Sequence, residues 1–341
     1  MSIISSTIGG KYDQSIANYY WKTIFKNQFH DSIYSSSPDS INETVKNRLL
    51  NLRHGLNELM WLNLRSLKDK LDFTAFKENE EAVVLFNTLP YKREDLVLLN
   101  FICKDKEFTL KDENDNIIPF VKVEHMEKIN TEIEHYNGTD NYHDAGEILE
   151  GTKFNVQVKI KGDILPKMGY KVIKVCYGEK FEEEVCGTVK LIDERTFENK
   201  FIKVKINDNG TLNVLNKENN VSYENVHYFE EKGDDGDEYN FSPPVVDKVI
   251  TTKELTPSIE LIENTSYEVK FKITFNIETP LECIEHKRTE EMVNSTISTE
   301  VSLKDNSKRV DFRTTIDNKA KDHIVKAIFE DVECSKESLA Q

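Results

Sequence analysis

The residues with the clearest chemical potential in this sequence are His30 and Asp31, which are adjacent near the end of the run Trp21 to Ile33. An imidazole can bind a metal or transfer a proton, and a carboxylate can accept hydrogen bonds from hydroxyl groups. A single His-Asp pair at the end of a helix is more often a cap or an ordinary polar contact. Taken alone, the pair favours the structural interpretation.

A second candidate is the acidic, glycine-containing run from Gly233 to Pro244. Its composition is equally compatible with a solvated turn and with a calcium site. A calcium loop of the helix-loop-helix kind requires a glutamate at its twelfth position and a helix on each side, and the sequence offers neither. Composition alone therefore assigns no ligand to this run.

The charge of the chain argues against polyanionic partners. There are 61 acidic and 45 basic residues, so the net charge is −16, and the pI is about 5.1. Lysines lie among glutamates, for example at 179–184 and 230–232, and we interpret these mixed runs as solvated surface. Because no basic patch opposes the overall charge, nucleic acid is not an expected partner.

Cysteine usage and hydropathy indicate in which cellular compartment the protein is expected. The N-terminal run from Met1 to Lys11 is polar, and no stretch approaches the roughly 20 apolar residues of a membrane span, so neither a leader peptide nor a membrane partner is expected. The cysteines include no C-x-x-C pair, which fits a reducing, cytoplasmic location. They are Cys103, Cys176, Cys186, Cys283 and Cys334.

Two helices are expected to position His30. From Asp13, which can cap the first turn, apolar residues recur at three- and four-residue spacing as far as Asn27. Ser37-Pro38-Asp39 predicts the start of a second helix. A two-helix hairpin cannot bury all its apolar surface, so we expect part of a three-helix bundle or packing on another domain. The apolar seam of the second helix is Val45, Leu49, Leu52, Leu56 and Leu59.

Beyond Leu71 the pattern changes to short apolar runs bounded by turn residues, which are typical of antiparallel strands. Turns at 87–90 and 165–170 help to define a small β-sandwich over residues 76–186. The polar segment 130–151, which contains His135 and His143, is interpreted as a long hairpin or flap. The expected strands are 82–86, 95–102, 154–160 and 171–176.

A second β domain is expected over residues 187–341. The turn Asn207-Asp208-Asn209-Gly210 predicts a hairpin, and further strands are expected at 266–277, 296–303 and 309–316. No closing strand is apparent after them, so the last sheet is expected to be truncated. The predicted fold class is multidomain α+β, with a helical segment over 1–75 followed by two mainly antiparallel β-sandwich domains.

Four stretches, in order, resemble glycoside hydrolase family 38 α-mannosidases of the bacterial branch. The resemblance runs from about Gly9 to Lys326 and covers the part of the family that follows its catalytic domain. It implies that the second sandwich is galactose-mutarotase-like. The first three stretches are His30-Asp31-Ser32-Ile33, Val83 to Pro90 with Arg93, and Leu165 to Tyr170. The fourth consists of three short runs, Glu198-Asn199-Lys200-Phe201, Asn209-Gly210-Thr211-Leu212 and Gly233 to Pro244.

The resemblance implies that His30 is the fourth ligand of a zinc ion and that Asp31, Asp237 and Tyr239 contact mannose. A zinc site needs about four ligands, and the family's His-x-Asp pair does not occur in this chain. The other ligands, the nucleophile and the acid/base are therefore expected in a catalytic domain outside the chain. Ser35 stands where the family has glycine, which predicts a different local backbone.

Three functions are compatible with these features. The leading hypothesis is the C-terminal part of a zinc-dependent retaining α-mannosidase that acts on α-mannosides or mannose-containing glycans and is inactive alone. The alternative is a carbohydrate-binding module without catalysis, in which Tyr136, Tyr142, Tyr228 or Tyr239 stacks on sugar rings. In a third hypothesis, a separately encoded catalytic domain docks on the helical hairpin. A homo-oligomer is compatible with each.

Overall fold

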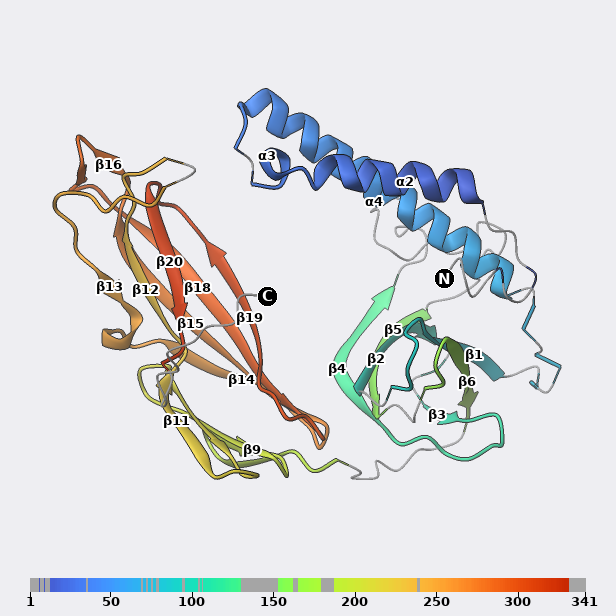
Figure 1. The fold of residues 1–341 in the computed structure, drawn as a ribbon. Helices are drawn as coiled ribbons and strands as arrows, with labels where there is room; N and C mark the ends of the chain where they lie inside the picture. Colours follow the sequence, from blue (N-terminus) through green and yellow to red (C-terminus); the bar gives the residue numbers. More distant parts are fainter. Residues whose placement is uncertain are drawn as a thin grey trace. The chain divides into compact units, whose positions relative to one another are not determined.

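The computed structural model describes residues 6, 9, 13–34, 36–68, 70–71, 73–74, 76–77, 80–93, 96–103, 105, 107–129, 153–161, 165–178, 187–237 and 240–330. The chain divides into two compact units, Met1–Glu183 and Glu184–Gln341 (Figure 1). Across these described ranges, no helix combines the length and the apolar character that crossing a membrane requires.

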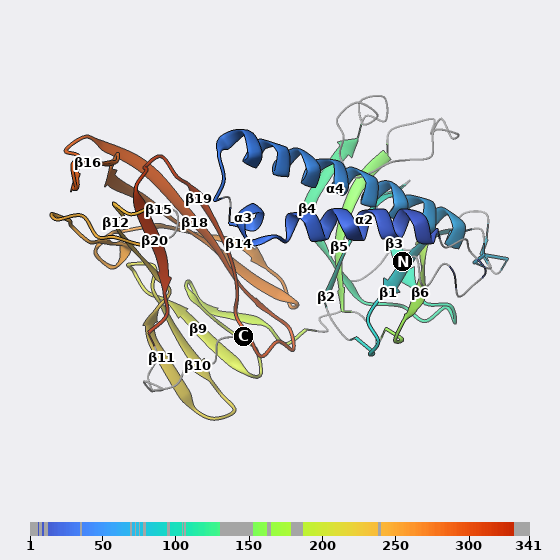
Figure 2. The ribbon, with the colours of Figure 1, turned by 45° about the horizontal axis from the view of Figure 1, so that its top comes forward.

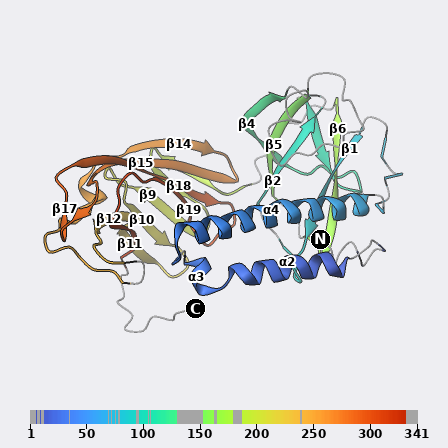
Figure 3. The ribbon, with the colours of Figure 1, turned by 90° about the horizontal axis from the view of Figure 1, so that it is seen from above.

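The helices of the first unit are α2 (Gln14–Asn27), α3 (His30–Ile33) and α4 (Asp39–Lys68). As predicted, Asp13 caps α2, and its Oδ1 accepts hydrogen bonds from the backbone N–H groups of Ser15 and Ile16 at 3.0 and 3.1 Å. Helices α2 and α4 lie side by side (Figures 2 and 3). Gly55 permits this approach, because a Cβ there would lie only 2.3 Å from the Tyr20 hydroxyl oxygen.

The hairpin of α2 and α4 buries only part of its apolar surface. Val45 and Leu52 of the predicted seam are 8% exposed, whereas Leu49 is 47% and Leu56 is 37% exposed. No third long helix is found in the described part of the chain to cover the remainder. The large apolar side chains exposed on and beside α2 and α3 are Ile16, Tyr19, Trp21, Phe25, Phe29, Ile33 and Tyr34.

The β region of the first unit consists of two three-stranded antiparallel sheets, with the strand orders β1-β6-β3 and β2-β5-β4. Both sheets contribute to one apolar core, in which the Phe108 and Phe120 rings stack at 5.2 Å. The strands are β1 (Glu80–Asn87), β2 (Leu96–Cys103), β3 (Phe108–Lys111), β4 (Phe120–Ile129), β5 (Lys153–Lys161) and β6 (Gly169–Tyr177).

Two of the motif stretches meet in this β region. Asn87, which is 1% exposed, donates from Nδ2 to the carbonyl oxygens of Tyr91 and Pro166 at 2.7 and 2.9 Å. Its Oδ1 accepts from the Leu89 N–H at 3.1 Å. One buried amide therefore holds both predicted turns, so these stretches have a structural role. The segment 130–151 lies outside the described residues.

The described residues of the second unit form four antiparallel sheets, with the orders β11-β10-β9-β8-β7, β14-β15-β18-β19, β13-β12-β20 and β16-β17. The prediction of mainly antiparallel β structure is thus confirmed. The strands are β7 (Lys190–Asp193), β8 (Thr196–Glu198), β9 (Ile202–Ile206), β10 (Leu212–Asn216), β11 (Val221–Val226), β12 (Tyr228–Gly233), β13 (Ile250–Thr251), β14 (Ser258–Asn264), β15 (Glu268–Pro280), β16 (Cys283–Ile284), β17 (Lys287–Arg288), β18 (Met292–Lys304), β19 (Asp311–Asp317) and β20 (His323–Ile328).

Strand β15 links the two apolar cores of this unit. Alternate residues from Val269 to Ile277 are at most 3% exposed, as period-2 geometry requires of a strand with one buried face. Val269 to Phe275 pack in the core of the five-stranded sheet, and Ile277 packs with Phe229 of β12. The predicted turn at Gly210 joins β9 to β10 with a positive φ of 78°.

The C-terminal strand β20 was not predicted from the sequence pattern. It pairs antiparallel with β12 from Tyr228 opposite Ile328 to Gly233 opposite His323. This pairing brings His323, the first residue of β20, opposite Gly233, where the acidic run starts.

Candidate functional site

His30 lies at the first position of α3, directly after Phe29, whose extended backbone ends the link from α2. Its Nε2 is 3.1 Å from Oδ1 of Asp31, and the two side chains are 70% and 42% exposed. The carbonyl groups of both residues accept local backbone hydrogen bonds, from Tyr34 and Ser36. The backbone of His30 is therefore held by local hydrogen bonds, whereas its imidazole ring is accessible to solvent. Ser35 lies outside the described residues.

The surroundings of His30 are apolar and exposed. The Phe29 ring lies 4.4 Å from the imidazole ring, and Phe29, Ile33 and Tyr34 are 55%, 55% and 76% exposed. Within the described ranges, no group of three or more His, Cys, Asp and Glu side chains is arranged to hold a metal ion. His30 can thus supply one nitrogen ligand to a metal, but its described neighbours do not complete a site.

In the second unit, hydrogen bonds link the two described parts, 234–237 and 240–242, of the acidic loop 234–242. Oδ1 of Asp234 accepts from the N–H groups of Gly236 and Ser242, both at 3.0 Å, and the Asp235 N–H donates to the Ser242 carbonyl oxygen at 2.7 Å. Asp237 is exposed, and its Oδ1 accepts from the Asn240 N–H at 2.8 Å. Tyr239 lies outside the described residues.

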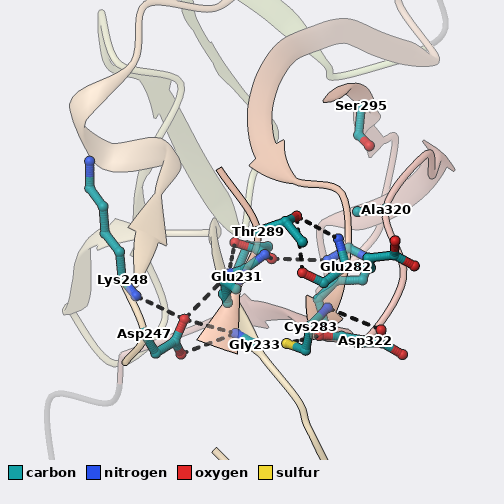
Figure 4. Close-up of polar contacts among 12 residues, drawn as sticks. Glu231, Gly233, Asp247, Lys248, Glu282, Cys283, Thr289, Ser295, Ala320 and Asp322 are labelled. Atoms are coloured by element: carbon teal, nitrogen blue, oxygen red, sulfur yellow. Dashed lines mark hydrogen bonds and ion pairs between the residues drawn. The ribbon is translucent and has the colours of Figure 1, made fainter. Parts of the chain in front are cut away.

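A buried ionic cluster lies next to this loop, and Figure 4 labels two of its members, Glu231 and Asp247. We call Glu231, Asp247, Arg288 and His323 the Glu231 cluster. Arg288 donates to both carboxylate oxygens of Glu231, with Nη1 to Oε2 at 3.0 Å, and the two side chains are 5% and 2% exposed. Nη1 of Arg288 also lies 3.4 Å from Oδ1 of Asp247. Such a forked contact fixes the orientation of both side chains.

His323 completes the cluster from β20. Its Nδ1 lies 3.0 Å from Oε1 of Glu231, and its Nε2 lies 3.0 Å from Oδ1 of Asn318. Because Oδ1 of Asn318 also accepts from the Ala320 N–H at 3.1 Å, the amide presents its oxygen to the ring. Both ring nitrogens therefore lie next to side-chain oxygen atoms, which hold the ring in one orientation.

The charges of the cluster influence one another. Burial raises the pKa of Glu231, but hydrogen bonds from His323 and Arg288 and the Arg288 charge outweigh burial and leave the pKa below its ordinary value. For Arg288, burial lowers the pKa, whereas the hydrogen bond and charge of Glu231 outweigh it and raise the pKa overall. Glu231 and Arg288 are thus held as an ion pair.

The buried state of Glu231 corrects one interpretation of the sequence. Residues 230–232 read as solvated surface, yet Glu231 is 1% exposed. The error arises because Glu231 alternates with outward-facing neighbours on β12, and its partners come from distant strands. Arg288 is 57 residues away and His323 is 92 residues away, so no local spacing indicates the cluster.

Of the four tyrosines that the binding-module alternative expects to stack on sugar rings, Tyr228 lies among the described residues. Its hydroxyl donates to Oε1 of Glu330 at 2.7 Å, and Nζ of Lys253 lies 4.0 Å from its ring centroid. The Lys253 ammonium group therefore covers one face of the Tyr228 ring, and a stacked sugar would need such a face. Tyr136, Tyr142 and Tyr239 lie outside the described residues.

The chain is similar in sequence and in fold to known glycoside hydrolases. Residues 197–339 match the sequence profile described as "Glycosyl hydrolases family 38 C-terminal domain". A protein of Halalkalibacterium halodurans named "Putative mannosylglycerate hydrolase" is 23% identical over 367 aligned positions, which cover 93% of this chain and 38% of that protein.

Two solved structures share the fold, each with a TM-score of 0.83 and 22% identity. One is an α-mannosidase from Enterococcus faecalis V583, matched over 95% of this chain and 40% of its own length. The other is a protein in glycosyl hydrolase family 38 from Enterococcus faecalis, matched over 96% and 42%. The chain therefore spans about two fifths of the length of these relatives. The predicted resemblance to family 38 is confirmed.

Proposed function

Because residues 197–339 match the C-terminal domain of family 38 glycosyl hydrolases, we propose that this chain is the C-terminal part of a zinc-dependent retaining α-mannosidase. The observation that carries the proposal is the accessible imidazole of His30 beside Asp31, at the start of a helix and among exposed apolar side chains. A buried or fully saturated histidine would not suit this role.

In this proposal His30 supplies one zinc ligand, and Asp31 accepts hydrogen bonds from mannose hydroxyl groups. Zinc, when bound, supplies positive charge that orients the sugar beside the nucleophile. The nucleophilic carboxylate and the acid/base belong to polypeptide outside this chain, about 5 Å apart as retention requires. The chain alone is then inactive.

The proposed partner is the catalytic domain, which would cover the exposed apolar side chains of the hairpin. Trp21 and Phe25 stack at 5.7 Å on α2 and are 56% and 64% exposed, so they offer a contiguous contact. The loop 234–242 would contribute Asp237 and Tyr239 to sugar binding. We propose a cytoplasmic location, in keeping with a sequence in which no two cysteines form a C-x-x-C pair.

The proposed substrate class is α-mannosides. The name of the Halalkalibacterium relative suggests mannosylglycerate as one substrate to test, and a nitrophenyl α-mannoside provides a general assay. Calorimetry tests the binding-module alternative. Clear binding of mannose by the chain alone, without metal, would favour it.

The deciding experiment joins this chain to a family 38 catalytic domain and measures α-mannoside hydrolysis with and without zinc. We expect zinc-dependent activity that His30→Ala lowers by about a hundredfold or more, as loss of a metal ligand does. The matched control is His54→Ala, which removes an exposed imidazole from α4 of the same hairpin. Activity that is absent, or is equal in the two variants, contradicts the proposal.

A further inference from the structure

Helices α2 and α4 lie side by side (Figure 3) and form a groove of about 350 Å³ between them. This volume is near the lower end of the range for small-molecule sites, about 300–1,000 Å³. The α4 wall consists of residues at positions i, i+3, i+4, i+7 and i+8, which share one face of the helix. A helix face that packs against another helix is ordinarily apolar, but four of these five residues are polar. They are Thr44, Asn47, Arg48, Asn51 and Leu52.

Arg48 supplies a positive charge to the groove, and none of the residues that line the groove is acidic. Nη1 of Arg48 donates to Oδ1 of Asn27, a neutral acceptor, at 2.9 Å, and no carboxylate of the described residues pairs with it. The segment 14–68 contains seven Lys and Arg against four Asp and Glu, whereas the whole chain has a net charge of −16. The guanidinium therefore lies in a basic part of an acidic chain and retains N–H donors for an anion.

The position of Arg48 depends on a buried amide. Asn27 is 5% exposed, and its Nδ2 has no hydrogen-bond partner in the part of the chain that the structure describes, although its Oδ1 accepts from Arg48. A buried donor without a partner costs about 1–3 kcal/mol, so the stability of the hairpin alone does not explain this arrangement. We interpret Asn27 as a residue that holds the guanidinium in the groove.

The threonines of the groove are suited to bind hydroxyl groups. Thr23 and Thr44 each donate to the backbone carbonyl oxygen four residues earlier, both at 2.9 Å. Their protons are therefore engaged, and the lone pairs of the two hydroxyl oxygens remain available as acceptors. A ligand that donates hydrogen bonds from hydroxyl groups matches this pattern.

Amide and aromatic side chains complete the walls. Asn47 and Asn51 lie one turn apart on α4, and their side chains make no hydrogen bond within the described ranges, so both offer donors and acceptors. On α2, the rings of Tyr19 and Tyr20 meet edge to face with centroids 5.4 Å apart. These rings, together with Leu52, can contact the carbon skeleton of a small ligand.

We propose that this groove binds a small hydroxy acid, whose carboxylate pairs with Arg48 and whose hydroxyl groups bond to the threonine and asparagine side chains. A planar carboxylate matches the forked donors of a guanidinium. Its single negative charge is balanced by the one guanidinium, whereas a phosphate group, at about −1.5 to −2, would keep part of its charge unbalanced. The site is independent of the proposed function, because none of its residues takes part in that function.

The first test is calorimetric titration of the whole chain with three hydroxy acids: gluconate, tartrate and lactate. We expect at least one of them to bind at a single site with a Kd of about 1 mM or tighter. Hexanoate lacks the hydroxyl groups, sorbitol lacks the carboxylate, and inorganic phosphate has a different charge, so each should bind at least about tenfold more weakly. Absence of binding by all three hydroxy acids, or equal binding of sorbitol or phosphate, would overturn the proposal.

The second test changes the guanidinium. Arg48→Met should weaken binding of the hydroxy acid about tenfold to a hundredfold, because it removes a charge-assisted hydrogen bond, and Arg48→Lys should retain part of the affinity. The matched control is Arg53→Met, since Arg53 is exposed on α4 and does not line the groove. Equal affinities of the Arg48→Met and Arg53→Met variants would contradict the site.

A third variant keeps the test independent of the stability of Arg48→Met. Asn51→Ala replaces an exposed residue by the residue that helices favour most, so the hairpin should remain folded, and far-UV circular dichroism checks this. We expect the hydroxy acid to bind about fivefold more weakly and hexanoate to bind as it does to the wild type. Unchanged affinity for the hydroxy acid in this variant would exclude α4 as a wall of the site.

Discussion

Two pairs of ionisable side chains in this protein have contrasting surroundings. His30 and Asp31 lie 3.1 Å apart on the first unit and are 70% and 42% exposed. Glu231 and Arg288 form a forked contact in the second unit and are 2% and 5% exposed. An exposed pair is screened by water and constrains the fold little, whereas a buried pair must be satisfied by its neighbours.

The difference indicates which site is complete within the chain. The Glu231 carboxylate is occupied by Arg288 and His323, so it has little capacity for a further ligand. The imidazole of His30 and the carboxylate of Asp31 are largely open to solvent. A residue that binds a metal or a substrate needs accessible ligand atoms. A residue that holds other segments in place has its polar atoms already engaged in hydrogen bonds.

The largest effect should come from breaking the buried pair. Arg288→Met leaves Glu231 buried beside His323 alone, so we expect the free energy of unfolding of the second unit to fall by about 3–5 kcal/mol. Urea denaturation, monitored by far-UV circular dichroism, measures this change in the free energy of unfolding. Lys308→Met, in a pair that is 62% and 48% exposed, is the control and should cost less than about 1 kcal/mol. Equal costs would show that burial does not distinguish the pairs.

The next effect depends on pH and on a buried histidine. His227 is 1% exposed, neither ring nitrogen has a hydrogen-bond partner, and its ring stacks on Phe312 at 4.6 Å. Burial lowers the pKa of His227 from 6.5 to about 4. Below pH 6.5 the unfolded chain binds this proton before the folded chain does, so stability present above pH 6.5 is lost as the pH falls to about 4.

We expect this loss to reach about 3 kcal/mol, from 1.36 kcal/mol per pKa unit. His227→Phe should remove this part of the acid sensitivity, and denaturation midpoints between pH 7 and pH 4 measure it. His54→Phe replaces an exposed histidine on α4 and serves as the control. Parallel pH profiles for wild type and His227→Phe would contradict the prediction.

A smaller effect is expected at the start of α2. Asp13→Ala removes the acceptor of two backbone N–H groups, those of Ser15 and Ile16, and should destabilise the helix by about 1 kcal/mol. Faster amide exchange in the first turn of α2 measures this, and Asp13→Asn should restore most of the protection. Loss of helix throughout the hairpin would exceed what a cap can explain.

The smallest effect should come from the exposed pair. Asp31→Asn is expected to change the free energy of unfolding by less than about 0.5 kcal/mol, because water screens the contact with His30. The same substitution should lower mannoside hydrolysis by the completed enzyme about a hundredfold or more if Asp31 binds substrate hydroxyls. A stability cost above 1 kcal/mol with unchanged activity would assign the pair to the fold instead.

The sequence predicted those elements whose pattern is local. The start of α2 at Asp13, the hairpin turn at Gly210 and the strands β15 and β18 all follow from caps, turn residues or alternation. Strand β20 was missed because its apolar residues are interrupted by Lys326 and its burial is uneven. Only two positions of the α4 seam are buried, since the hairpin lacks a further partner among the described residues.

For the candidate sites, the sequence identified His30 and Asp31 through resemblance and not through spacing. It did not identify Glu231, Arg288 or His323, because only the pairing of β12 with β20 and the position of β17 bring them together. A charged residue beside other charged residues indicates solvent exposure on average. That expectation fails when the strand pairing buries every second position.

Strand β15 has a consequence for how the second unit breaks. Thirteen residues in one continuous strand pair with β18 along their whole length and supply side chains to both apolar cores. Neither core can open while the other stays closed unless this strand is severed. The unit should therefore melt in a single step, and a protease cut within residues 268–280 should abolish both cores at once, whereas nicks in the surrounding loops leave them intact.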